Sequence, residues 1–264
     1  MKVLALDFDG VISDSAPECF WVALQTLVRL RPSERYRALL EELHGLDGTQ
    51  AREAVARGPL YRDFLELMPL GNRAEDFGVA LLALAAGVKL DSQEAYDRYY
   101  NSLGPDFAED FHRQFYRERD DFRNAEPERW AALMNPYPEL LEALRRHSGE
   151  VEFALATAKD GASVSELIAR YQVADLLGPD RVFDKRAGRD KRAHLRRVRE
   201  RFDVEFSQIS FIDDKVNHLI PVKELGVRCF LASWGYNGPR EHALAQDRGI
   251  GVCGLAQLES LVFS

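Results

Sequence analysis

The spacing of hydrophobic and polar positions divides this chain of 264 residues into two parts with different periodicity. Between about residues 17 and 134, apolar side chains recur every three or four positions, as in Tyr36, Leu39, Leu40 and Leu43. This spacing predicts amphipathic helices. Breaks that contain glycine or proline, at 45–48, 57–59, 69–72 and 103–105, split the region into several separate helices, and no strand is predicted there.

The part of the chain after the NPYP turn at 135–138 alternates short apolar runs with helical periodicity. This alternation predicts parallel strands joined by right-handed helical crossovers. Four apolar runs each precede a helical segment: 151–157 before 162–171, 181–184 before 191–202, 208–213 before 216–225, and 227–232 before 240–247.

The first apolar run, Val3–Leu6, has no strand partner near it in the sequence. It must pair with the strands after residue 150, so the helical region interrupts one α/β domain. We therefore predict an α/β fold: a doubly wound parallel sheet, a Rossmann-like core over residues 1–15 and 136–264, with an inserted all-helical cap domain over residues 16–135.

Polar side chains stand where several of the predicted strands end. Asp7 and Asp9 follow the first strand, Thr157 closes the second, and Asp213 and Asp214 close the run at 208–213. Parallel strands bring these ends to one edge, where open α/β sheets bind ligands. Two unit charges about 4 Å apart repel by roughly 4 kcal/mol at an effective dielectric near 20, so we expect these carboxylates to share a proton or a cation. A set of hard oxygen ligands without histidine or cysteine favours Mg²⁺.

A basic residue is expected to complete this set of polar groups. Lys191 stands at the start of the helix that precedes the 208–213 strand, and Lys185 lies shortly before it. One of the two should face the strand ends, and we favour Lys191 because of its position at a helix start. Carboxylates, a hydroxyl, an ammonium group and Mg²⁺ together suit phosphoryl transfer, and a carboxylate can act as the nucleophile that forms an aspartyl-phosphate.

Four motifs in this order resemble those of the haloacid dehalogenase-like hydrolase superfamily. DFDGV at 7–11 is similar to its first motif, LATAK at 155–159 to its second, the helix-initiating Lys191 to its third, and FIDDK at 211–215 to its fourth. The resemblance covers the α/β portion, and the helical region has the position of the family's cap. YPELLEALRRH at 137–147 resembles the helix that leads into the second motif. DS at 14–15 and WGYN at 234–237 resemble the phosphoglycolate-phosphatase-like branch.

The resemblance implies a role for each residue that carries it. Asp7 would be the catalytic nucleophile, and Asp9 would protonate the leaving oxygen and then activate water. Thr157 would hydrogen-bond the phosphoryl oxygens, and Lys191 would offset the charge of nucleophile and phosphate.

The same resemblance implies a Mg²⁺ site. The Asp7 carboxylate, the Asp9 backbone carbonyl and Asp213 would hold the ion, and Asp214 would be a further ligand or would support one. His218 follows shortly after this motif, but we expect it to be an ordinary helix residue because Mg²⁺ rarely binds imidazole.

Composition narrows the class of partner. With 35 Lys and Arg against 43 Asp and Glu, the formal charge is −8, which disfavours nucleic acid and anionic membranes as partners. The basic run at 185–201 carries an apolar stripe, Leu195, Val198 and Phe202, so its arginines are expected on a solvated helix face.

Hydropathy and cysteine usage favour a cytoplasmic protein. The longest apolar stretch, 77–88, is too short to span a bilayer, and Asp7 interrupts the N-terminal apolar run too early for a signal peptide. The three cysteines have no paired spacing and are expected to be reduced thiols.

These observations predict a Mg²⁺-dependent phosphatase that acts on a small phosphorylated metabolite through an aspartyl-phosphate. Two alternatives share the same residues: a phosphomutase of the same architecture, and a regulatory module that is phosphorylated on aspartate without turnover. Dehalogenation is disfavoured because Asp9 would have no role as an acid and base. The pattern predicts neither the substrate nor the oligomeric state.

Overall fold

The computed structural model describes residues 1–71, 73–188 and 190–263. The chain divides into two compact units. The core unit comprises Met1–Asp14 and Pro136–Ser264, and the helical unit comprises Ser15–Asn135.

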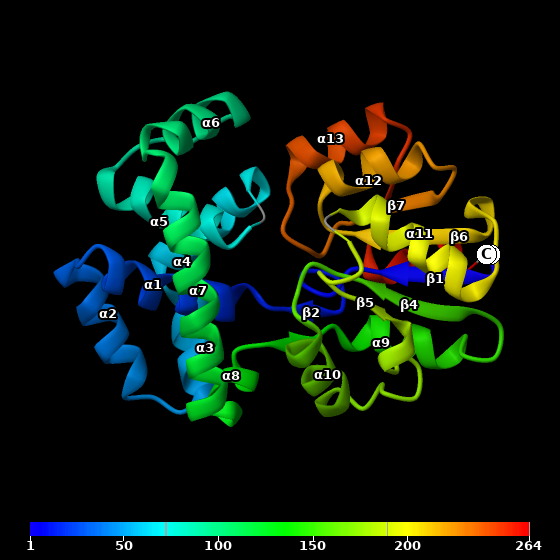
Figure 1. The fold of residues 1–264 in the computed structure, drawn as a ribbon, viewed down its shortest axis with the longest axis horizontal. Helices are drawn as coiled ribbons and strands as arrows, with labels where there is room; N and C mark the ends of the chain where they lie inside the picture. Colours follow the sequence, from blue (N-terminus) through cyan, green and yellow to red (C-terminus); the bar gives the residue numbers. More distant parts are fainter. Residues whose placement is uncertain (72, 189, 264) are drawn as a thin grey trace. The chain divides into compact units, whose positions relative to one another are not determined.

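The core unit is built on a six-stranded sheet in the order β5-β4-β1-β6-β7-β8, and every pairing in it is parallel (Figure 1). The predicted α/β fold with a parallel sheet is confirmed. Along the chain the strands are β1 (Val3–Leu6), β4 (Glu152–Ala156), β5 (Val182–Phe183), β6 (Ile209–Asp213), β7 (Arg228–Ala232) and β8 (Gly251–Cys253). A separate two-stranded sheet pairs β2 (Ser13–Asp14) with β3 (Asn135–Pro136).

Strand β1 lies at the centre of this sheet between two strands that are distant in the sequence. Ala5 is the register partner of Ala154 on one side and of Phe211 on the other. All four residues of β1 are buried, as expected for a strand covered on both faces. The predicted pairing of Val3–Leu6 with strands that follow residue 150 is therefore confirmed. Strand β8 was not predicted, because three residues at the sheet edge give too little periodicity to recognise.

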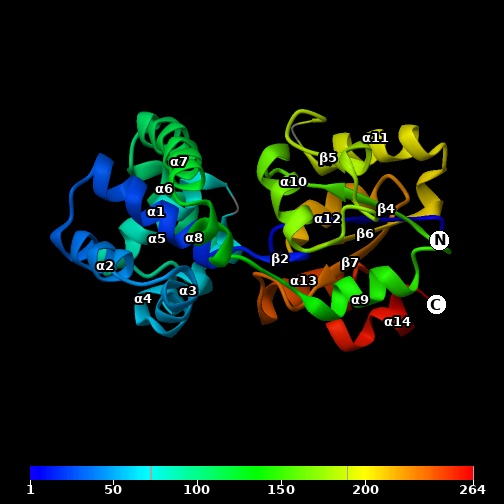
Figure 2. The ribbon, with the colours of Figure 1, turned by 90° about the horizontal axis from the view of Figure 1, so that it is seen from below.

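Helices cover both faces of the sheet (Figure 2). Helices α11, α12 and α13 pack on the face that carries Val3, Ala5 and Phe211, and α9 and α14 lie on the opposite face. Residues of a strand alternate between faces, so Asp7 shares the α11 face with Val3 and Ala5. The helices of this unit are α9 (Pro138–Arg146), α10 (Gly161–Arg170), α11 (Lys191–Phe202), α12 (Val216–Lys223), α13 (Pro239–Asp247) and α14 (Leu258–Leu261).

Within residues 15–71 and 73–135 of the helical unit, the regular elements between β2 and β3 are helical, including a short 3-10 turn, η1 (Met68–Leu70). Helices end and begin at the predicted breaks 45–48, 57–59 and 103–105, and also at 31–33 and 87–92, where no break was predicted. Proline at the first position of α4, α7 and α8 fits the helix start, because the backbone donor that it lacks would have no helical partner there. The helices are α1 (Ala16–Leu30), α2 (Glu34–His44), α3 (Gly48–Arg57), α4 (Pro59–Leu67), α5 (Ala74–Ala86), α6 (Gln93–Ser102), α7 (Pro105–Ala125) and α8 (Pro127–Ala132).

Aromatic side chains form the centre of the helical unit, where Trp21, Phe111 and Phe115 are almost completely buried. A buried ion pair crosses this core: Arg119 Nε lies 2.7 Å from Glu18 Oε1, and Arg119 Nη2 lies 2.8 Å from Glu18 Oε2. The Trp130 indole N–H also donates to Glu18 Oε1 at 3.2 Å. Paired and hydrogen-bonded in this way, the two charges are tolerated inside the core.

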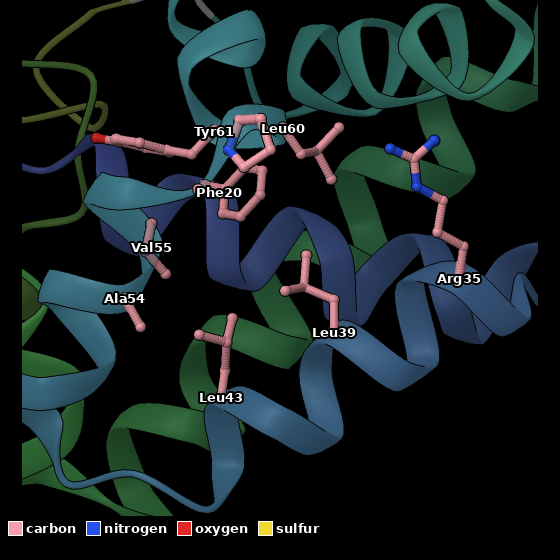
Figure 3. Close-up of a pocket in the computed structure, with 10 residues that line it drawn as sticks. Phe20, Arg35, Leu39, Leu43, Ala54, Val55, Leu60 and Tyr61 are labelled. Carbon is pink, nitrogen blue, oxygen red and sulfur yellow. The ribbon is translucent and has the colours of Figure 1, made fainter.

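The same unit contains an apolar cavity of about 210 Å³ among α1, α2, α3 and α4 (Figure 3). Phe20, Leu43 and Val55 line it, and Arg35 stands at its edge. None of the helices in the described ranges combines the length and apolar character needed to cross a membrane.

Candidate active site

Asp7 and Asp213 are neighbours at the carboxyl end of the sheet because β1 and β6 run parallel in this register. Leu6 pairs with Ile212, and the Asp7 backbone N–H donates to the Ile212 carbonyl oxygen at 2.9 Å. Asp7 is 7 % exposed and Asp213 is completely buried. The sheet thus holds two carboxylates side by side on the α11 face, with little water to screen them.

Lys191 places its ammonium group between these two carboxylates. Its Nζ lies 2.8 Å from Asp7 Oδ2 and 3.1 Å from Asp213 Oδ2, and it donates to the Ala156 carbonyl oxygen at 2.7 Å. Lys191 is the first residue of α11, whose N-cap is Asp190. Lys185, the other candidate, is exposed. Of the two lysines, the structure therefore brings Lys191 into the carboxylate pair.

Burial and charge set the ionisation of these groups in opposite directions. Burial raises the pKa of Asp7 to about 7; Lys191 opposes this shift and Asp213 adds to it. Burial also disfavours ionised Asp213, but Lys191 and His218 outweigh it and lower the pKa of Asp213. Burial would lower the pKa of Lys191, yet the two carboxylates raise it. Lys191 thus contacts both carboxylates, but the pKa of Asp7 is raised while that of Asp213 is lowered.

Asp9 follows β1 in a tight turn. Gly10 has a φ of 77°, in the left-handed region that glycine adopts without strain. The Asp9 side chain is 31 % exposed, more than Asp7, and its Oδ1 lies 3.1 Å from Lys159 Nζ. The Lys159 side chain is completely buried. Lys159 was not predicted as a site residue. Its position in the LATAK motif, two residues after Thr157, is the sequence signal that could have identified it.

Thr157 lies at the carboxyl end of β4, the neighbour of β1 in the sheet. Its side chain is almost completely buried. Its backbone N–H donates to the Phe183 carbonyl oxygen at 3.0 Å, and its Oγ1 accepts from the Lys159 backbone N–H at 3.1 Å. The hydroxyl is thus fixed at the same sheet edge as the carboxylates.

Asp214 points into the loop after β7 and contacts the turn after β1. Its Oδ2 accepts from the Tyr236 backbone N–H at 2.9 Å. The space around it is so tight that a Cβ on Gly235 would lie 2.3 Å from Asp214 Cβ, and one on Gly10 would lie 2.6 Å from Asp214 Oδ2. Trp234 anchors this loop through its indole N–H, which donates to the Val11 carbonyl oxygen at 3.0 Å. Asp214 thus supports this loop, and its predicted role as a metal ligand or as a support for one stays a prediction.

His218 joins Asp7 and Asp213 in a group of three possible metal ligands. One ligand atom from each residue lies within 4.8 Å of the others. His218 belongs to α12, as expected from the sequence, but its Nδ1 also lies 3.1 Å from both carboxylate oxygens of Asp213. This contact was not expected.

The donor groups fit a small divalent cation. Two carboxylates meet at the sheet edge, and the raised pKa of Asp7 reflects a buried negative charge that Lys191 does not fully balance. A divalent cation beside Asp7 would balance it, and carboxylate oxygens are ligands that Mg²⁺ accepts.

No family model matches the chain, and no curated protein sequence does. Many solved structures match over nearly its whole length. A predicted phosphoglycolate phosphatase from Haemophilus somnus is 16 % identical with a TM-score of 0.63, and the match covers 99 % of this chain and 97 % of that one. A haloacid dehalogenase-like hydrolase from Streptococcus pneumoniae is 13 % identical with a TM-score of 0.58, covering 100 % and 98 %. A candidate β-phosphoglucomutase from Thermotoga maritima is 17 % identical with a TM-score of 0.54, covering 100 % and 99 %.

These similarities are too low in sequence to transfer an activity, but they extend over the core unit and the helical unit alike. The chain therefore has the fold of the haloacid dehalogenase-like hydrolases that its four motifs resemble.

Proposed function

We propose that this chain is a phosphoric monoester hydrolase that requires Mg²⁺ and acts on a small phosphorylated metabolite. The observation that carries the proposal is the Lys191 ammonium held between Asp7 and Asp213 at the ends of β1 and β6. In this arrangement the Asp7 carboxylate is held rigidly beside a positive charge. Phosphoryl transfer depends on such positioning and on neutralising negative charge.

In the first step, a carboxylate oxygen of Asp7 forms a bond to phosphorus while the bond from phosphorus to the ester oxygen breaks. Asp9 gives its proton to the departing alcohol oxygen. The Asp9 side chain suits proton transfer to and from the substrate because it is more exposed than that of Asp7. Thr157 donates its hydroxyl hydrogen to a phosphoryl oxygen, and Lys191 balances the charge beside Asp7.

In the second step, Asp9 takes a proton from water, and the water oxygen forms a bond to phosphorus. The bond between phosphorus and Asp7 breaks, which restores the carboxylate and releases inorganic phosphate. Asp7, Asp213 and the Asp9 backbone carbonyl would hold Mg²⁺, which when bound supplies positive charge to the phosphoryl oxygens.

The three cysteines in the described ranges, Cys19, Cys229 and Cys253, are buried free thiols. They support the cytoplasmic setting that the sequence indicates, since reduced thiols are usual there.

The test is a hydrolysis screen over common phosphomonoesters, with Mg²⁺ and with EDTA, on the wild-type chain and on Asp7→Asn. Asp247→Asn, on the exposed end of α13, is the matched control. We expect phosphate release in wild type and control with Mg²⁺, and none in Asp7→Asn or with EDTA. Equal activity in Asp7→Asn would remove the proposal. Formation of a bisphosphorylated product would redirect it to a phosphomutase.

A further inference from the structure

The imidazole of His218 lies inside the carboxylate cluster. α12 begins at Val216, two residues before His218, so the side chain lies in the first turn of this helix. Its Nδ1 is equidistant, at 3.1 Å, from the two oxygens of Asp213, and the side chain is 26 % exposed. The helix start therefore presents a nitrogen beside the buried Asp213 carboxylate and within 4.8 Å of an oxygen of Asp7.

Asp213 does not depend on His218 for its hydrogen bonds. Its Oδ1 accepts from the Lys215 backbone N–H at 2.8 Å, and its Oδ2 lies 3.1 Å from Lys191 Nζ. Each oxygen thus has another donor, and a buried carboxylate would be satisfied without the imidazole. The position of His218 calls for a different explanation.

The distances in the cluster suit a shared cation. Nδ1 of His218, one oxygen of Asp7 and one of Asp213 lie within 4.8 Å of one another. Ligand atoms bound to a single ion at about 2.1 Å lie about 3 to 4 Å apart, so small side-chain movements bring all three onto one ion.

We propose that His218 is a nitrogen donor to the divalent cation that the proposed function requires, beside Asp7 and Asp213. Imidazole suits Zn²⁺ and the later first-row metals much better than it suits Mg²⁺, and the affinity of a given site rises from Mn²⁺ to Co²⁺. The site consequently holds Co²⁺ more tightly, relative to Mg²⁺, than a site of oxygen ligands alone. In this proposal His218 is a metal ligand. It gives the site a preference for Co²⁺ over Mg²⁺ that the carboxylates alone would not give.

A role for His218 in merely orienting Asp213 predicts something different. Loss of a residue that positions a ligand weakens binding by about 10- to 100-fold and acts on every cation through the same carboxylate. Loss of a nitrogen ligand, in contrast, mainly lowers the affinity for those metals that favour nitrogen ligands. The ratio of affinities therefore separates the two roles.

The experiment measures binding of Mg²⁺, Mn²⁺ and Co²⁺ to the full chain by calorimetry and competition, without substrate. The variants are His218→Asn and His218→Asp, with His112→Asn in the helical unit as the control. Folding is checked by circular dichroism. Pulsed electron paramagnetic resonance of the Mn²⁺ complex reports directly whether an imidazole nitrogen is bound.

We expect a nitrogen coupling in the wild-type Mn²⁺ complex that disappears in both His218 variants and persists in His112→Asn. His218→Asn should lose Co²⁺ affinity by about tenfold or more and Mg²⁺ affinity by less than about threefold. His218→Asp, with an oxygen in place of the nitrogen, should keep Mg²⁺ and lose the preference for Co²⁺.

Three results would overturn the inference: no nitrogen coupling in wild type, equal losses for all three ions, or no binding of a divalent cation at all. The first two leave the proposed function intact, because Mg²⁺-dependent hydrolysis that needs Asp7 is measured separately. Conversely, a nitrogen coupling in a chain that hydrolyses no monoester would remove only the proposed function.

Discussion

Replacing Lys191 with methionine should destabilise the protein far more than the same change at Lys185. Methionine keeps an unbranched side chain of similar length without the charge. In the wild-type chain, Lys191 Nζ has two carboxylate contacts, at 2.8 and 3.1 Å, and one carbonyl contact at 2.7 Å. Lys191→Met leaves the buried carboxylates of Asp7 and Asp213 without their shared cation.

The size of the effect follows from this burial. Removing one partner of a buried ion pair costs about 3 to 5 kcal/mol, because the remaining charge is uncompensated. At about 2 to 4 °C per kcal/mol for a chain of this size, the midpoint of thermal unfolding should fall by roughly 10 °C. Lys185→Met changes an exposed side chain and should stay within about 0.5 kcal/mol of wild type.

The assay is thermal unfolding followed by circular dichroism at pH 8 in EDTA, so that no divalent cation replaces the lysine. Combining Lys191→Met with Asp7→Asn should recover part of the loss, since one of the two uncompensated carboxylates is then neutral. Equal midpoints for Lys191→Met and Lys185→Met would refute the assignment of Lys191 as the cation between the carboxylates.

Three further changes test other parts of the structure. Burial raises the pKa of Asp7 from 3.8 to about 7, so the folded state binds more protons than the unfolded state between these values. Stability in EDTA should therefore fall as pH rises from 4 to 7, by up to about 4 kcal/mol from this group, and unfolding midpoints across that range should fall less steeply in Asp7→Asn. A Cβ on Gly235 would lie 2.3 Å from the Cβ of a neighbouring aspartate, so Gly235→Ala should lower the unfolding midpoint and hydrolysis, whereas Gly149→Ala meets nothing within 4 Å and should leave both unchanged. In the helical unit, Glu18→Gln leaves the buried Arg119 without its ion-pair partner, and the free energy of unfolding in urea should fall by about 3 to 5 kcal/mol. Glu53→Gln removes an exposed ion pair with Arg57 and should lower the free energy of unfolding by less than about 1 kcal/mol. Equal losses in the two variants would contradict the role of burial.

Periodicity in the sequence was sufficient to predict the parallel sheet and the interruption after β1. Val3–Leu6 has no local partner, and pairing on both sides with β4 and β6 follows from that fact. Strand β8 was not predicted, because the edge strand Gly251–Cys253 is too short to show an alternation of apolar and polar residues.

The contacts at the site depend on geometry that the sequence does not display. The sequence alone does not distinguish the roles of the adjacent residues Asp213 and Asp214. In the structure, the parallel register places Asp213 beside Asp7, whereas Asp214 faces the loop that contains Tyr236. The contact of His218 with Asp213 depends on where α12 starts and in which direction its first turn faces. Such features require coordinates, because neighbouring residues of a strand or helix point in different directions.

The central claim is that Asp7 becomes covalently phosphorylated during turnover, and trapping the acyl phosphate tests it most directly. The enzyme is quenched while it turns over p-nitrophenyl phosphate with Mg²⁺, reduced with borohydride, digested and analysed by mass spectrometry. Reduction converts a phosphorylated aspartate to homoserine, and we predict homoserine at Asp7 only when substrate and Mg²⁺ are both present. Hydrolysis of the substrate with Asp7 unmodified, or with homoserine at another aspartate, would contradict the account.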